Sequence, residues 1–187
     1  MSDQSTSLFP TAEQKPARRQ LEWNASTDVG LLLLRFAIGG VFFAHGVQKV
    51  FGLWGGPGIG GFARNLDGFG YTSAATLSWV VGIAELVFGA FLVLGVLTPF
   101  AAAGLVGIKI NAVLLKAAGG FFIASPAGAN AVELDVVIGL GAAALVFTGP
   151  GRIALDRGPW HTRPAWGALC IVVGVAAGLL VYFLLRR

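Results

Sequence analysis

Five long apolar segments follow one another along this chain, and each is close to the length that a helix needs to cross a bilayer. An α-helix rises 1.5 Å per residue, so about 20 apolar residues span the hydrocarbon core. Because no water is present there, a spanning segment must satisfy its own backbone hydrogen bonds, which favours a helix. The segments cover residues 29–51, 75–96, 100–118, 131–147 and 166–185. The sequence therefore predicts an all-α membrane protein.

The composition agrees with a chain surrounded by lipid. It is 56% apolar and only 12% charged, whereas an ordinary soluble domain is about 25% charged. The net charge of +4 does not indicate a nucleic-acid partner, because the basic residues lie at segment ends and in short loops. In such places they set topology and contact lipid headgroups. The lone Cys170 excludes an intramolecular disulfide and a CxxC redox pair.

The chain divides into three parts. Residues 1–28 are polar and lack a hydrophobic period, so we expect a disordered tail. Residues 29–156 are expected to form a four-helix membrane domain, and residues 157–187 a basic loop with a fifth transmembrane helix. The fourth segment is the shortest and begins with charged residues, so a buried helix with a polar first turn is an alternative to a span there. In the glycine-rich loop 52–74, Phe62 and Leu66 recur at helical spacing, which predicts a short helix packed on the bundle.

The distribution of basic residues predicts the orientation in a plasma (inner) membrane. Lysine and arginine flank transmembrane segments preferentially on the cytoplasmic side. More of these residues fall on the side of the N-terminus than on the other, which favours a cytoplasmic N-terminus. The basic residues on that side are Lys15, Arg18, Arg19, Arg152, Arg157 and Arg163. The terminal pair Arg186–Arg187 argues mildly in the other direction.

Ionisable residues interrupt the apolar segments and are the candidate site residues. Arg35, His45 and Lys49 fall within an arc of roughly 80° on one face of the first segment, so this face is expected to point into the bundle. Glu85 and Lys109 lie near the centres of the second and third segments, which form a tight hairpin. We therefore expect these two side chains to lie at one depth and to interact, directly or through water.

A second group of ionisable residues is expected at one rim of the bundle. The fourth segment starts on the side where the first and third segments end, so five side chains gather there: His45, Lys49, Lys116, Glu133 and Asp135. A charge in the bilayer centre costs at least about 2.5–3.5 kcal/mol, so ionisable residues kept there tend to be functional. Ion pairs that only hold the bundle together produce the same pattern and remain an alternative. No metal site is predicted, since no second histidine joins His45 in the membrane segments.

From the first segment to residue 156 the chain resembles the DoxX family of small membrane proteins. The resemblance rests on four stretches in order: Arg35-x-x-x-Gly39 with His45-Gly46-x-x-Lys49-x-Phe51-Gly52; Gly60-Gly61-Phe62; Gly82-Ile-Ala-Glu85-Leu86 with Leu94-Gly95-Val-Leu97-Thr98; and Glu133 with Gly149-Pro150-Gly151-Arg152-Ile-Ala-Leu155-Asp156. Family members are four-helix membrane bundles. Some are linked to thiosulfate:quinone oxidoreduction and others to oxidative-stress or thiol-redox assemblies.

The resemblance implies a redox-associated membrane subunit with soluble or membrane redox partner proteins. In this interpretation His45, Glu85 and Glu133 handle protons, while Arg35, Lys49 and Lys109 hold a substrate such as a quinone headgroup or a small sulfur compound. No bound redox centre can be identified in the chain itself, and a quinone is the one cofactor considered. A small-solute transport protein or a non-catalytic scaffold is the alternative function. Lys109 and Asn111 stand where relatives are more apolar, which leaves the substrate open.

The fifth segment carries small residues at four-residue steps. Cys170, Gly174 and Gly178 form a stripe that allows another helix to approach closely. Packing against the chain's own bundle is one interpretation. Contact with a second copy of the chain through Gly174 and Gly178 is the other.

Overall fold

The structure is a computed structural model, which describes residues 24–124, 128, 131–156, 158 and 164–186. Within these residues the chain forms helices and no strand, apart from an isolated bridge between Tyr71 and Arg186. The helices are α1 (Ala25–Phe51), η1 (Leu53–Gly55), α2 (Gly58–Gly68), α3 (Ala74–Leu94), α4 (Thr98–Lys116), η2 (Ala117–Gly119), α5 (Glu133–Thr148) and α6 (Pro164–Leu185). All five apolar segments are therefore helices, as predicted, and the glycine-rich loop contains the expected short helix. The predicted disordered tail lies almost wholly outside the described residues.

Four helices of the described part are long and apolar enough to cross a membrane: α1, α3, α4 with its short extension, and α6. These confirm an all-α membrane protein. Helix α5 has 16 residues, which corresponds to about 24 Å at 1.5 Å per residue and falls short of the ~30 Å core. The total of five spans therefore stays a prediction, because α5, the fourth predicted segment, is not among the four.

Helix α1 begins four residues before the predicted segment because a cap precedes it. The side chain of Asn24 accepts a hydrogen bond from the backbone N–H of Thr27 at 3.2 Å. Asp28 lies in the first turn, where a negative charge is favourable. The polar residues that we assigned to the tail thus provide the start of the helix.

Small residues set the two closest helix contacts. Along α1 and α3, a side chain at Gly39, Gly46 or Gly89 would collide with the facing backbone. Along α4 and α6, Gly174 faces the carbonyl of Ala103 and Gly178 faces that of Gly107. The stripe of small residues in α6 is thus filled by α4 of the same chain, which is the first of the two interpretations above.

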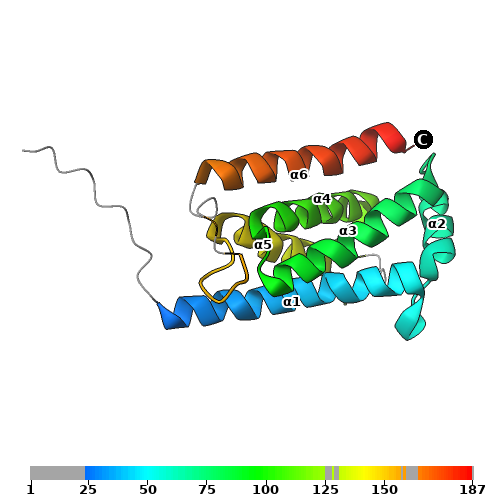
Figure 1. Ribbon diagram of the computed structural model, residues 1–187. Helices are drawn as coiled ribbons and strands as arrows, with labels where there is room; N and C mark the ends of the chain where they lie inside the picture. The colour runs from blue at the N-terminus through cyan, green and yellow to red at the C-terminus, as the bar shows by residue number, and fades with distance from the viewer. Residues whose placement is uncertain (1–23, 125–127, 129–130, 157, 159–163, 187) are drawn as a thin grey trace, which may run out of the picture.

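The helices lie side by side as an elongated bundle (Figure 1). Helix α6 runs along α4, and α2 crosses the end of the bundle at which α1 terminates. Helix α6 ends there too. This is shown by the backbone N–H of Thr72, just after α2, which donates to the carbonyl of Leu185 at 2.9 Å. The beginning of α1 and the end of α6 are therefore at opposite ends of the bundle.

Candidate functional site

A cavity of about 610 Å³ lies between the helices at the end that α2 crosses. This volume is within the range of small-molecule sites, roughly 300–1,000 Å³. Most of its wall is apolar, with Phe62, Leu66, Leu77, Phe88 and Ile138 among the lining side chains. Six helices contribute to the lining, so the site exists only in the folded bundle.

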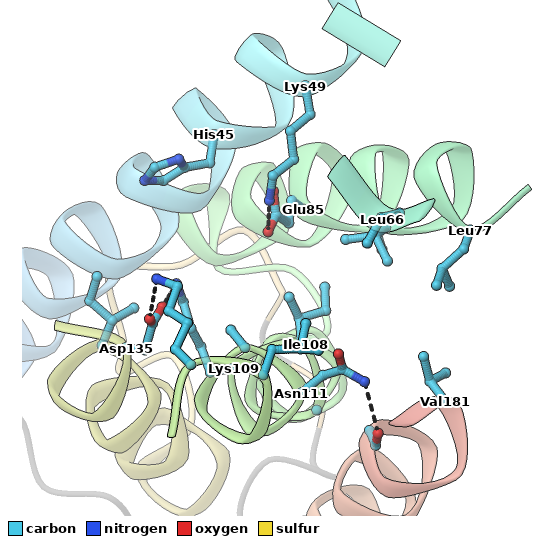
Figure 2. A pocket seen from close by; sticks show the side chains of 18 of the residues that line it. His45, Lys49, Leu66, Leu77, Glu85, Ile108, Lys109, Asn111, Asp135 and Val181 are labelled. Atoms are coloured by element: carbon cyan, nitrogen blue, oxygen red, sulfur yellow. Dashed lines mark hydrogen bonds and ion pairs between the residues drawn. The ribbon is translucent and has the colours of Figure 1, made fainter. Parts of the chain in front are cut away.

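The first ion pair in the cavity joins α1 to α3. The ammonium of Lys49 lies 2.5 Å from both carboxylate oxygens of Glu85. The Glu85 side chain is only 3% exposed, whereas that of Lys49 is 21% exposed. The same ammonium lies 4.9 Å from the centre of the Phe62 ring, a cation–π contact with α2. Figure 2 shows Lys49 extending across the cavity toward Glu85.

The second charged group joins α4 to α5. Lys109 and Lys116 each donate to a different oxygen of Asp135, at 2.8 and 2.7 Å. The two lysines are seven residues apart, so they lie on nearly the same face of α4. Lys109 also lies 5.1 Å from the centre of the Phe42 ring on α1. One carboxylate thus holds two ammonium groups at the wall of the cavity.

His45 stands at the edge of the cavity, between these two charged groups. It lines the cavity from α1 (Figure 2), and the residue is exposed. Among the residues that the structure describes, the imidazole makes no hydrogen bond. The described residues also contain no group of three or more His, Cys, Asp or Glu side chains placed to hold a metal ion. The ring nitrogens are therefore available to a ligand as donor and acceptor.

A further polar chain borders the cavity on the side of α6. The Tyr71 hydroxyl donates to Asn111 Oδ1 at 2.5 Å, and the Asn111 amide donates to the carbonyl of Gly178 at 3.2 Å. Burial raises the pKa of the Tyr71 phenol above its ordinary value of 10.0, more than the hydrogen bond from Tyr71 to Asn111 lowers it. Asn111 thus connects three parts of the chain, namely the segment that contains Tyr71, helix α4 and helix α6.

Four of the six predicted site residues line this one cavity, namely His45, Lys49, Glu85 and Lys109. The predicted pairing of Glu85 with Lys109 is not the one observed. Each is paired with another residue, Glu85 with Lys49 and Lys109 with Asp135. The hairpin does place both side chains at the cavity. Lys49, on the polar face of α1, is the residue that pairs with Glu85.

Arg35 is not in the cavity. It lies in the first half of α1, at the level of the end of α3, and is buried with 1% exposure. Its guanidinium donates to the carbonyls of Pro150 and Val93, at 2.6 and 3.3 Å. A side chain at Gly95 would collide with this guanidinium. Arg35 therefore fastens the Gly149–Asp156 stretch to the end of α3, which is a structural role rather than the predicted substrate contact.

Glu133 is also outside the cavity lining. Its carboxylate accepts a hydrogen bond from the backbone N–H of Ile123 at 3.0 Å and so closes the loop before α5. Asp135, which the sequence placed at the rim but not among the site residues, takes the position in the cavity instead. Residues two apart in a helix point about 200° apart, so only one of the two acidic residues can face inward.

Comparison with known proteins gives consistent matches along most of the chain. The family model described as DoxX matches residues 30–118, from the start of α1 to just beyond α4. An uncharacterized membrane protein of Mycobacterium tuberculosis is 32% identical over 78% of this chain and 90% of its own length. An uncharacterized protein of Haemophilus influenzae is 30% identical, over 70% of this chain and 83% of its own length.

A third relative carries a functional name. The Bacillus subtilis protein named "Putative oxidoreductase CatD" is 29% identical over 71% of this chain and 89% of its own length. No solved structure matches the chain.

Proposed function

This chain belongs to the DoxX family of membrane proteins, and we propose that it is the membrane subunit of a redox system that uses a quinone or a small sulfur compound. The name of the Bacillus subtilis relative supports an oxidoreductase context. The observation that carries the proposal is the cavity, which combines an apolar wall with charged groups on one side. A quinone has the same division between a polar headgroup and an apolar tail.

The proposal gives each cavity residue a task. Lys49 and Lys109 hold a carbonyl or anionic group of the ligand, because each ammonium has three N–H donors and only part of them engage a carboxylate. His45 exchanges a proton with the ligand, since it stands at the cavity edge and its imidazole can donate or accept a hydrogen bond. Glu85 keeps Lys49 in position and is the acceptor through which a proton leaves. Arg35 and Glu133 have no task at the ligand.

The proposal includes a location in the plasma membrane with the N-terminus in the cytoplasm. The excess of lysine and arginine on the side where α1 begins supports this orientation. In that orientation the cavity lies toward the outer face of the membrane, because it is at the end where α1 terminates. Partner proteins that deliver or accept electrons would meet the subunit from the membrane or from that face.

The test uses membrane vesicles from cells that contain the full chain and its natural partners. The quinol-dependent electron transfer rate is measured with wild-type chain, with Glu85→Gln, and with the exposed α2 residue varied as Arg64→Gln. We expect a rate that requires the chain, falls at least about tenfold in Glu85→Gln and is unchanged in Arg64→Gln. Because one unpaired lysine can impair folding, the double variant Lys49→Gln/Glu85→Gln is measured beside them, with equal amounts of folded protein.

Two other outcomes would replace the proposal. A chain-dependent uptake of solute into vesicles without any electron acceptor would indicate a transport protein. Neither electron transfer nor uptake, together with co-purification of soluble oxidative-stress proteins, would indicate a scaffold.

A further inference from the structure

The formal charges of the residues that line the cavity do not sum to zero. Among the residues that the structure describes, the lining contains three lysines, Lys49, Lys109 and Lys116, and two carboxylates, Glu85 and Asp135. With His45 neutral, the formal sum over these lining residues is +1, from three positive and two negative charges. Glu133, which the sequence placed in the same rim group, lies outside the lining and adds no negative charge to it.

The hydrogen bonds point in the same direction as the charges. All four carboxylate oxygens of Glu85 and Asp135 already accept from a lysine. Each ammonium carries three N–H groups, so the cluster offers donors beyond those that its own carboxylates use. A ligand that fits these donors must bring an acceptor, and a charged acceptor makes the stronger hydrogen bond.

The wall between α1 and α5 opens sideways. These helices touch where Ile38 lies against Gly141, and a side chain there would approach Ile38 to 2.7 Å. Two turns further toward the cavity, the corresponding positions are His45 and Leu134. Both of these line the cavity and both are exposed. The opening is thus on the flank of α1, a helix long and apolar enough to span the membrane, and not only at the end of the bundle.

We infer that the cavity binds amphipathic molecules with a single negative charge on the headgroup, and that they enter from the bilayer between α1 and α5. The excess ammonium charge holds the headgroup beside Lys116 and Asp135, and the apolar wall holds the body of the molecule. This inference rests on the proposed use of the cavity as a ligand site and adds to the proposed quinone a second class of ligand, amphiphiles that carry one negative charge.

The test uses the full chain in nanodiscs of phosphatidylcholine and three photoactivatable probes with one alkyl chain. The headgroups are a sulfonate, an alcohol and a trimethylammonium. After illumination, attachment sites are mapped by peptide mass spectrometry. We expect the sulfonate to label peptides that contain His45 or Leu134 at least about tenfold more than the alcohol, and the trimethylammonium probe not to label them. Equal labelling by sulfonate and alcohol, or labelling confined to other surfaces, would overturn the inference.

Variants of Lys116 make the test specific, because this side chain is partly exposed and its replacement leaves two neutral ion pairs. Lys116→Gln should abolish the preference for the sulfonate, and Lys116→Arg should keep it. Arg64→Gln removes one positive charge from the exposed part of α2 and should change nothing. A preference that survives in Lys116→Gln at full strength contradicts the charge argument.

Competition separates this inference from the proposed function. If a short-chain quinone displaces the probes although sulfonate and alcohol label equally, the charge preference is wrong and the proposed function stands. If the sulfonate labels selectively but neither quinones nor sulfur compounds displace it, the inference stands and the proposed function fails.

Discussion

The buried ion pair between Lys49 and Glu85 allows a prediction with a worked magnitude. Glu85→Gln leaves the Lys49 ammonium without its carboxylate, and Lys49→Gln leaves the Glu85 carboxylate without its ammonium. Removal of one partner from a buried pair costs about 3–5 kcal/mol, and a lone charge in the membrane costs about 2.5–3.5 kcal/mol on the mildest scale.

The two single variants are expected to differ because the partners differ in exposure. Lys49 is 21% exposed and retains the Phe62 ring, so its side chain can shift toward water after Glu85→Gln. Glu85 is 3% exposed and has no such route after Lys49→Gln. We expect losses of about 3 kcal/mol for Glu85→Gln and about 4 kcal/mol for Lys49→Gln, whereas the double variant loses only about 1–2 kcal/mol.

The assay is reversible unfolding of the four proteins in mixed detergent micelles, followed by far-ultraviolet circular dichroism. From these losses the coupling free energy of this double-mutant cycle should be about 5–6 kcal/mol. Additive losses would show that the two groups do not interact in the folded protein. Greater damage from Glu85→Gln than from Lys49→Gln would refute the reasoning from exposure.

Three further predictions concern other parts of the bundle. Arg35→Gln should lower the free energy of unfolding by about 3 kcal/mol, because a charged donor loses two carbonyl acceptors. Labelling of the cavity by the probes should not change in this variant. Gly178→Ala should cost about 1–3 kcal/mol because the added methyl group meets a carbonyl of α4, whereas nothing lies within 4 Å of the corresponding methyl group in Gly30→Ala. In a Tyr182→Phe background, Tyr71 is the remaining tyrosine and its absorbance should titrate with a midpoint above 10.0. Since burial raises this pKa, the associated stability is present below pH 10 and is lost as the pH rises through the folded-state pKa.

The helices were predictable because hydrophobic length and helical periodicity are local properties of the sequence. The end of α1 was predicted at Phe51, where the structure has it, since a glycine in the left-handed conformation follows. The beginning was predicted too late because Asn24 and Asp28 are polar and resemble a tail. Their value as a cap becomes visible only when the helix is known to continue before them.

The sequence could predict which residues line the cavity where several ionisable residues share one helix face. His45 and Lys49 share one face of α1, and both face the cavity. Arg35 belongs to the same stripe, but three turns along the helix place it at the level of the end of α3, against the backbone of residues 93 and 150. A face argument gives direction around a helix and does not give the neighbour at each depth.

The choice between partners was not predictable, because it depends on helix packing. The sequence paired Glu85 with Lys109, which lies at the same depth in the hairpin, but the close glycine contact between α1 and α3 brings Glu85 to Lys49. Asp135 was missed for a similar reason. The start of α5 could be placed only to within a few residues, and a shift of two residues decides whether Glu133 or Asp135 faces inward.

The cavity is proposed to hold a redox-active ligand, either a quinone or a small sulfur compound. The most direct measurement is the amount of quinone or sulfur compound bound per chain after native purification in lipid, determined by extraction and mass spectrometry relative to the bulk membrane. We predict clear enrichment in wild type and in Arg64→Gln, and its loss in the folded double variant Lys49→Gln/Glu85→Gln. Equal amounts in all three proteins, no greater than in the surrounding membrane, would contradict the claim.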